Sequence, residues 1–198
     1  MPALVPRTAD GEKFRFRAGR PSLDLCSTLL WRYVTPAEQL RSPGDLARWA
    51  AAAGLQPVPR RASEDDLRVA RSLREALYRL FHAHLDGRDL PPADVRCVNA
   101  AAAPAGAVPQ LIVGGQLRWR ASRPAQAALS AVARDGIDLL TGPLAGRIRE
   151  CAEPDCAFLF ADTSRPGQRR WCAMNRCGNR HHVRAHRARR PDGRQAGP

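Results

Sequence analysis

The sequence predicts a mainly α-helical fold: a helical domain with an inserted β-hairpin, then a small cysteine-containing module that ends in a basic helix. Three observations predict it. Apolar residues recur at the helical period in several segments before residue 145. A pair of glycines separates two short apolar runs near the middle of the chain. After Gly146 the composition changes, and four cysteines follow in two matched pairs.

Helix signals divide the first part of the chain into several segments. Ser63 and Asp66 have the spacing of a capping box, and Gly87 stops the helical period that follows them. Pro43 suits the first turn of a helix, and Gly142 ends the last helical segment of this part. We therefore expect helices over residues 21–33, 42–54, 63–86, 91–102 and 124–140. Cys26 and Cys97 fall within these apolar helical patterns, and we expect both to be buried structural cysteines.

Two segments favour β structure. The glycine pair at 114–115 supplies the positive φ angles of a tight turn, so the runs Leu111–Val113 and Leu117–Trp119 are expected to pair as a hairpin. Near the N-terminus, Phe14–Phe16 alternates apolar and basic residues like a short strand.

Composition and charge narrow the classes of partner. Of 198 residues, 44% are apolar, enough for a hydrophobic core. The net charge is +13, the pI is near 11.1, and Lys13 is the only lysine among the 32 basic residues. Such a balance favours polyanions as partners.

Residues 1–20 lack the roughly 7–15-residue apolar stretch of a signal peptide. No segment approaches the roughly 18 apolar residues of a spanning helix. We therefore expect a cytoplasmic protein with no membrane partner, whose cysteines are reduced or bind metal.

The four C-terminal cysteines have the pattern of a zinc site. Cys151 and Cys156 form one pair, Cys172 and Cys177 form the other, and each pair encloses four residues. Two short loops that each present two thiolates suit the tetrahedral coordination of Zn²⁺, and four thiolates leave no open position for catalysis. We therefore expect one structural Zn²⁺ held by these four cysteines. Two alternatives remain open: four cysteines without metal, or competition from the nearby histidines at 181, 182 and 186.

Between the pairs, residues 158–160 and 170–171 are expected to form a small hairpin that covers the metal.

An arginine cluster follows. Residues 165–190 contain nine arginines and no acidic residue. In a helix that begins near Asn179, the side chains of Arg180, Arg184 and Arg187 share one face. Like charges stacked in this way repel each other unless an anion lies against them, and phosphate matches the planar guanidinium. The alternative is a solvated basic face. The candidate nucleic-acid contacts are Arg169, Arg170, Arg176, Asn179, Arg180, Arg184, Arg187, Arg189 and Arg190.

These motifs resemble a known pair of families. Residues 171–180 read WCAMNRCGNR and residues 183–189 read VRAHRAR, which closely resembles the CGNR-type zinc finger. The upstream region, through the motifs Leu23-Asp24-Leu25 and Val98-Asn99-Ala100 and through the hairpin, resembles the ABATE domain that is commonly joined to this finger. The resemblance implies that the four cysteines bind zinc and that the protein regulates transcription. The expected organisation is an ABATE-like domain over 15–142, a finger over 147–190 and a disordered tail over 191–198.

The function that we expect is therefore DNA binding by the finger, with the helical domain as a sensor of a small molecule or as a dimerisation domain. A single finger offers a small contact area, which favours a homodimer. The alternative is a module that binds RNA or another protein. We expect no enzyme, because the chain has no Gly-rich phosphate loop, nucleophile elbow or HExxH motif. Polar residues in apolar segments either line a ligand pocket or make structural hydrogen bonds; the candidates are Asp24, Ser27, Thr28, Trp31, Arg32 and Asn99.

Overall fold

The computed structural model describes residues 14–188, and its fold is mainly helical, as the sequence predicts. The helices are α1 (Pro21–Cys26), α2 (Pro43–Ala52), α3 (Glu64–Leu85), α4 (Pro92–Ala102), α5 (Pro124–Thr141) and α6 (Asn179–Ala188). The strands are β1 (Leu29–Leu30), β2 (Ala37–Glu38), β3 (Val108–Ile112), β4 (Gln116–Arg120), β5 (Ile148–Glu150) and β6 (Leu159–Ala161). They form three separate two-stranded antiparallel sheets.

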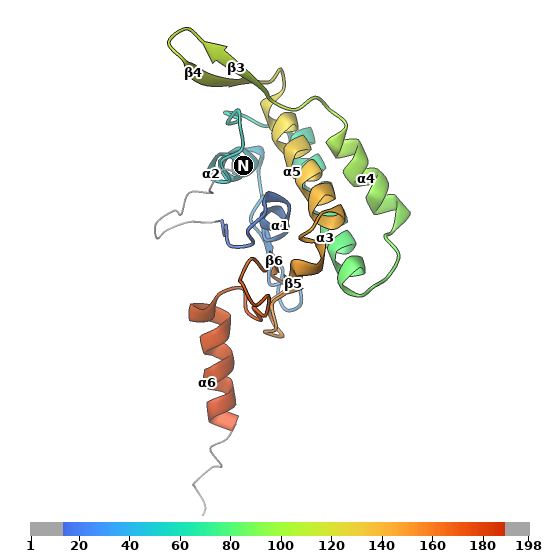
Figure 1. Ribbon diagram of the computed structural model, residues 1–198, viewed down its shortest axis with the longest axis vertical. Helices are drawn as coiled ribbons and strands as arrows, with labels where there is room; N and C mark the ends of the chain where they lie inside the picture. Colours follow the sequence, from blue (N-terminus) through green and yellow to red (C-terminus); the bar gives the residue numbers. More distant parts are fainter. Residues whose placement is uncertain (1–13, 189–198) are drawn as a thin grey trace, which may run out of the picture.

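The helical domain is built around α3, which contacts α1, α2, α4 and α5 (Figure 1). Trp49 of α2 and Phe81 of α3 are fully buried at its centre. The hairpin β3–β4 projects from one end of the molecule, and α6 lies at the opposite end (Figure 1). No helix in residues 14–188 is long and apolar enough to cross a membrane.

The predicted helix starts are confirmed at α2 and α3. Each begins with a complete capping box, formed by Ser42 with Asp45 and by Ser63 with Asp66. In both, the aspartate carboxylate accepts the backbone N–H of the serine, and the serine hydroxyl accepts the backbone N–H of the aspartate. These bonds satisfy backbone donors that a helix N-terminus leaves without partners.

The first helix is shorter than the predicted 21–33, because α1 ends at Cys26. The hydroxyls of Ser27 and Thr28 donate to the carbonyls of Asp24 and Leu25, at 2.8 and 2.7 Å. Such side-chain bonds compete with the helical ladder. The chain then turns through Trp31, whose φ of 55° cannot belong to a right-handed helix. The apolar run that follows the helix therefore forms β1 and pairs with β2.

The strand predicted over Phe14–Phe16 is absent. The next backbone N–H groups, of Arg17 and Ala18, donate to the carboxylate of Asp24 instead of to a strand. Phe14 is buried, and the Phe16 ring stacks on Trp49 with the ring centroids 6.5 Å apart. The alternation therefore reflects packing of the two phenylalanines and not a sheet.

The hairpin β3–β4 confirms the prediction and extends it by several residues at its open end. Leu111 pairs with Leu117, and Gly114 and Gly115 turn the chain with φ angles of 97° and 78°. Its side chains are largely exposed, with Leu111 at 81%.

The cysteine module shares the core of the helical domain. Ile148 of β5 and Phe160 of β6 are fully buried within the same apolar cluster as Trp49 and Phe81. The N–H of Ala161 donates to the carbonyl of Ala18 at 2.8 Å, which ties β6 to the segment before α1. The prediction that residues 158–160 pair with residues 170–171 as a hairpin is wrong, because β6 pairs with β5.

Candidate zinc centre and nucleic-acid interface

The four predicted zinc ligands converge on one point. The Sγ atoms of Cys151, Cys156, Cys172 and Cys177 all lie within 4.8 Å of one another, and all four side chains are buried. Cys172 Sγ lies 3.8 Å from Cys156 Sγ and 3.5 Å from Cys177 Sγ. Four sulfurs at about 2.3 Å from a tetrahedral zinc are separated by about 3.8 Å. The donor set and its spacing therefore fit one structural Zn²⁺.

Each pair of cysteines lies on a tight turn. In the first, the N–H of Cys156 donates to the carbonyl of Glu153 at 2.8 Å. In the second, residues Met174–Gly178 form a single π-helical turn, and the N–H of Cys177 donates to the carbonyl of Ala173. A Cβ on Gly178 would lie 2.4 Å from the sulfur of Met174, so glycine permits this close packing.

The environment of Cys151 favours its thiolate. Hydrogen bonds among the thiols lower the pKa of Cys151 and raise the pKa values of Cys156 and Cys172, and the backbone N–H of Cys172 donates to the Cys151 sulfur at 3.4 Å. A thiolate is the form that binds zinc. Of the histidines considered as competing ligands, His181 packs against the Trp171 ring with centroids 4.6 Å apart, and the His186 side chain lies outside the described residues.

Asp162, which the sequence reasoning missed, organises the long loop between the two turns. One of its carboxylate oxygens accepts the N–H and hydroxyl of Ser164, and the other accepts the N–H of Arg169 at 2.9 Å. The hydrogen bond from the Ser164 hydroxyl is the main cause that lowers the pKa of Asp162 to about 2. The carboxylate therefore holds residues 162–169 in a closed loop, which also explains why this segment does not pair as a hairpin.

Two of the predicted phosphate contacts have partners inside the protein. The Arg169 guanidinium donates to the carbonyls of Trp171 and Cys172 and lies 4.3 Å from the centroid of the Phe160 ring. The Arg184 guanidinium lies 2.6 Å from a carboxylate oxygen of Glu153, whose side chain is fully buried. The anion that pairs with Arg184 of this basic helix is therefore a carboxylate from the first cysteine turn.

The other predicted contacts are distributed as follows. Arg170, Asn179 and Arg180 are exposed, and Arg176 is half-buried. The guanidinium carbon of Arg180 lies 5.6 Å from the ring centroid of Trp31, a residue of the helical domain. The Arg187 side chain, Arg189 and Arg190 lie outside what the structure describes.

The candidate pocket residues do not surround one cavity. Asp24 and Ser27 bond to backbone groups, as described above. Thr28 also accepts a hydrogen bond from Arg74, and Arg32 makes a two-bond ion pair with Glu75. Asn99 is exposed on α4, and Trp31 lies at the junction with the zinc module. The contacts of Asp24, Ser27, Thr28 and Arg32 therefore favour structural hydrogen bonds over a ligand pocket.

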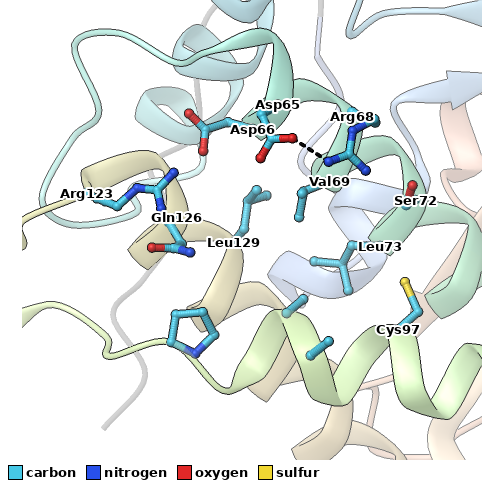
Figure 2. Close-up of a pocket in the computed structure, with 13 residues that line it drawn as sticks. Asp65, Asp66, Arg68, Val69, Ser72, Leu73, Cys97, Arg123, Gln126 and Leu129 are labelled. Carbon is cyan, nitrogen blue, oxygen red and sulfur yellow. Dashed lines mark hydrogen bonds and ion pairs between the residues drawn. The ribbon is translucent and has the colours of Figure 1, made fainter.

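A cavity of about 300 Å³ lies away from these residues, between α3, α4 and α5 (Figure 2). None of the six candidate residues lines it. Leu73 and Leu129 form part of its apolar wall, and Arg123 and Gln126 lie on one side of it (Figure 2). Small-molecule sites commonly have such apolar walls with few polar groups. The sequence pattern did not reveal this cavity, because its lining comes from helix faces that meet only in the folded chain.

Two family models match the chain, in the predicted order. The ABATE model, described as "Putative stress-induced transcription regulator", matches residues 19–143, and the CGNR zinc finger model matches residues 147–190. No curated protein matches the sequence. Because the first model covers more than half of the residues, the chain belongs to the ABATE family, and it carries a CGNR zinc finger.

Proposed function

From this family membership and the geometry of the zinc module, we propose that the protein is a DNA-binding transcription regulator that contacts DNA through its zinc finger. The observation that carries the proposal is the set of arginines beside the zinc centre. Among residues 14–188, no carboxylate forms an ion pair with Arg170, Arg176 or Arg180. Guanidinium groups that are held in place without a protein counter-ion suit the phosphates of a nucleic acid.

Within this proposal zinc has a structural role. The four cysteines are buried, and the side chains between them are mostly polar, so the metal supplies the cross-link that fixes the second turn and the start of α6. The arginines at 170, 176 and 180 lie within or directly beside this cross-linked segment, which keeps their spacing. Four thiolates leave no open coordination position, so we assign no catalytic step to the metal.

We further propose that the helical domain senses a small molecule, and we place the candidate site in the cavity of Figure 2. Its volume is at the lower end of the range that is typical of ligand sites, about 300–1,000 Å³. Val69→Trp, at a half-buried residue of its lining, would occupy part of it. A compound that raises the melting temperature of the wild-type protein but not of this variant would locate the site; equal shifts in both would exclude the cavity.

The test of DNA binding is fluorescence anisotropy with a labelled duplex of random sequence, at several salt concentrations. We expect Arg170→Ala/Arg180→Ala to weaken binding and to lower the dependence of log K on log salt by up to about 1.8, since each phosphate contact contributes about 0.9. The matched control is Arg118→Ala/Arg120→Ala, which removes the same charge from the exposed strand β4. Equal effects of both variants would mean non-specific attraction.

RNA or protein binding is the alternative function. Parallel selection from random duplex DNA and single-stranded RNA pools separates the nucleic acids. Enrichment of RNA alone would refute the DNA proposal. If the wild-type protein binds nucleic acid from neither pool at low salt, we would assign the finger to the binding of another protein.

A further inference from the structure

A concave region lies where the helical domain meets the zinc finger, and arginines from both parts line it. Arg15 and Arg17 come from the segment before α1, and Arg176 and Arg180 come from the second cysteine turn and α6. Trp31 lies among them and also lines, with Arg180, an adjoining groove of about 480 Å³. The basic surface therefore extends beyond the finger.

These four arginines have no carboxylate partner in the part of the chain that the structure describes. Asp155 borders the adjoining groove, but its nearest guanidinium is that of Arg184, at 3.7 Å. The zinc centre accounts for part of the positive charge, because four thiolates and one Zn²⁺ leave a net charge of −2. Two of the four guanidinium groups would balance that charge. The other two remain available to an external anion.

Trp31 joins the two sets of arginines. The guanidinium carbons of Arg15 and Arg180 each lie 5.6 Å from its ring centroid, so the ring contacts one arginine of each part. The residue has a φ of 55°, which non-glycine residues rarely adopt. Strained backbone of this kind occurs preferentially at functional sites.

We propose that Arg15, Arg17, Arg176 and Arg180 form one phosphate-binding surface for duplex DNA, and that Trp31 is a positioning residue that holds Arg15 and Arg180 in place. The inference rests on the proposed DNA-binding function and extends it to the helical domain. The N-terminal segment then contacts the DNA backbone directly, so a change in the helical domain can alter DNA affinity without unfolding the finger.

One signal for this surface is present in the sequence. Arg15 and Arg17 alternate with Phe14 and Phe16 in the sequence, and both arginines line the concave region. By itself the alternation predicts a strand. The distance in sequence between residues 15 and 180 hid their proximity.

The test is the salt dependence of duplex binding by Arg15→Ala/Arg17→Ala. We expect the slope of log K against log salt to fall by up to about 1.8 and the affinity to fall at least tenfold. Zinc content and melting temperature are measured in parallel, so that only folded protein is compared. The matched control is again Arg118→Ala/Arg120→Ala, at the opposite end of the molecule (Figure 1).

Trp31→Gly tests whether the Trp31 side chain positions the arginines or only stabilises the fold. Glycine adopts a positive φ freely, so we expect unchanged folding but weaker DNA binding. The effect should be smaller in the Arg15→Ala/Arg17→Ala background, where only Arg180 is left for Trp31 to position. If the wild-type protein binds duplex DNA and the arginine variant keeps its salt slope, this inference is wrong while the proposed function stands. If the wild-type protein binds no duplex DNA, both fail. Tighter binding of single-stranded RNA through the same arginines would replace DNA as the ligand.

Discussion

The helical domain and the zinc finger use arginine in different ways. In the helical domain, guanidinium groups pair with carboxylates; the pairs are Arg20 with Asp135, Arg32 with Glu75, Arg74 with Glu38 and Arg79 with Asp94. In the finger, Arg169 binds backbone carbonyls and Arg184 binds Glu153, whereas Arg176 and Arg180 have no such partner among the described residues. Arginine therefore serves mainly to hold the fold in the helical domain, apart from Arg15 and Arg17, and leaves charge available for a ligand in the finger.

The two regions also differ in what holds them together. The helical domain buries large side chains such as Trp49, Phe81 and Leu77 from several helices. In the finger, β5 and β6 share that core, but the segment from Cys172 to α6 buries little apart from its cysteines and Gly178. This segment therefore depends on the metal.

Removal of zinc should have the largest effect. Structural zinc contributes about 10–16 kcal/mol of apparent binding free energy in isolated zinc peptides, and that energy is coupled to folding. We expect a chelator, or Cys172→Ser, to unfold the cysteine turns and α6 while α3 keeps its amide protection. Hydrogen exchange along the chain, together with zinc analysis, measures this.

Cys97→Ser is the control for the cysteine substitution, because Cys97 lies on α4, away from the zinc ligands. It should retain one zinc per chain. Uniform loss of protection in both regions after chelation would show that the shared core couples them into one cooperative unit, so that the finger does not depend on the metal separately.

The buried ion pairs give the next largest effect. Arg74 is almost fully buried, with Glu38 and Glu75 at 2.7 and 2.8 Å. Arg74→Met leaves Glu38 with only Arg71, at 3.8 Å, and Glu75 with only Arg32. We expect this change to cost about 3 kcal/mol of unfolding free energy. Urea denaturation measures it. Arg68→Met is the control, because it removes an exposed pair with Asp65 that contributes about 0–1 kcal/mol. DNA affinity should be unchanged in both variants while they remain folded.

Asp24 differs from the other buried carboxylates of the helical domain, because it binds backbone N–H groups and not a guanidinium. Burial raises the pKa of Asp24 to about 7, although the N–H groups of Ala18 and Arg17 oppose this shift. In the unfolded chain an aspartate has a pKa near about 3.9. The folded state therefore binds the proton more tightly, and its contribution to stability is present below about pH 4 and lost as the pH rises to about 7.

Asp24→Asn keeps an oxygen acceptor for the two N–H groups and removes the charge. We expect the variant to be more stable than wild type at pH 8 and to lose a dependence of up to about 1.4 kcal/mol per pH unit between about pH 4 and 7. Melting curves across this range measure it. A wild-type protein that becomes more stable with rising pH over this window would contradict the assignment to Asp24.

Local signals in the sequence predicted much of the fold. The capping box of Ser63 and Asp66 and the glycine pair at 114–115 act on neighbouring residues, so the start of α3 and the turn of the hairpin could be predicted. The zinc ligands could be predicted because their chemistry and spacing lie within one short segment. The end of α1 was missed because the side chains of Ser27 and Thr28 bond back to the helix, which the apolar pattern does not reveal.

Contacts across the chain could not be predicted in this way. Residues 165–190 contain no acidic residue, so the sequence predicts no carboxylate partner for this arginine cluster. The fold nevertheless places the carboxylate of Glu153, which precedes the cluster, against Arg184. Nothing in residues 158–160 distinguishes pairing with β5 from pairing with the segment before Cys172; Asp162 decides it by closing the loop that follows β6.

The smallest expected effect contrasts two arginines of α6. Arg184→Ala leaves the buried Glu153 carboxylate without its cation, and because Arg184 itself is half-exposed we expect a loss of about 1–2 kcal/mol of finger stability. Arg180→Ala removes no ion pair, so we expect unchanged stability but a fall of about 0.9 in the salt slope of DNA binding. Thermal melting and anisotropy on both variants measure the two effects.

Glu153→Gln in the Arg184→Ala background should restore part of the stability, because a neutral amide is less costly to bury than an unpaired carboxylate. A stability loss from Arg180→Ala that equals the loss from Arg184→Ala would mean that arginines in the finger also serve mainly to hold the fold.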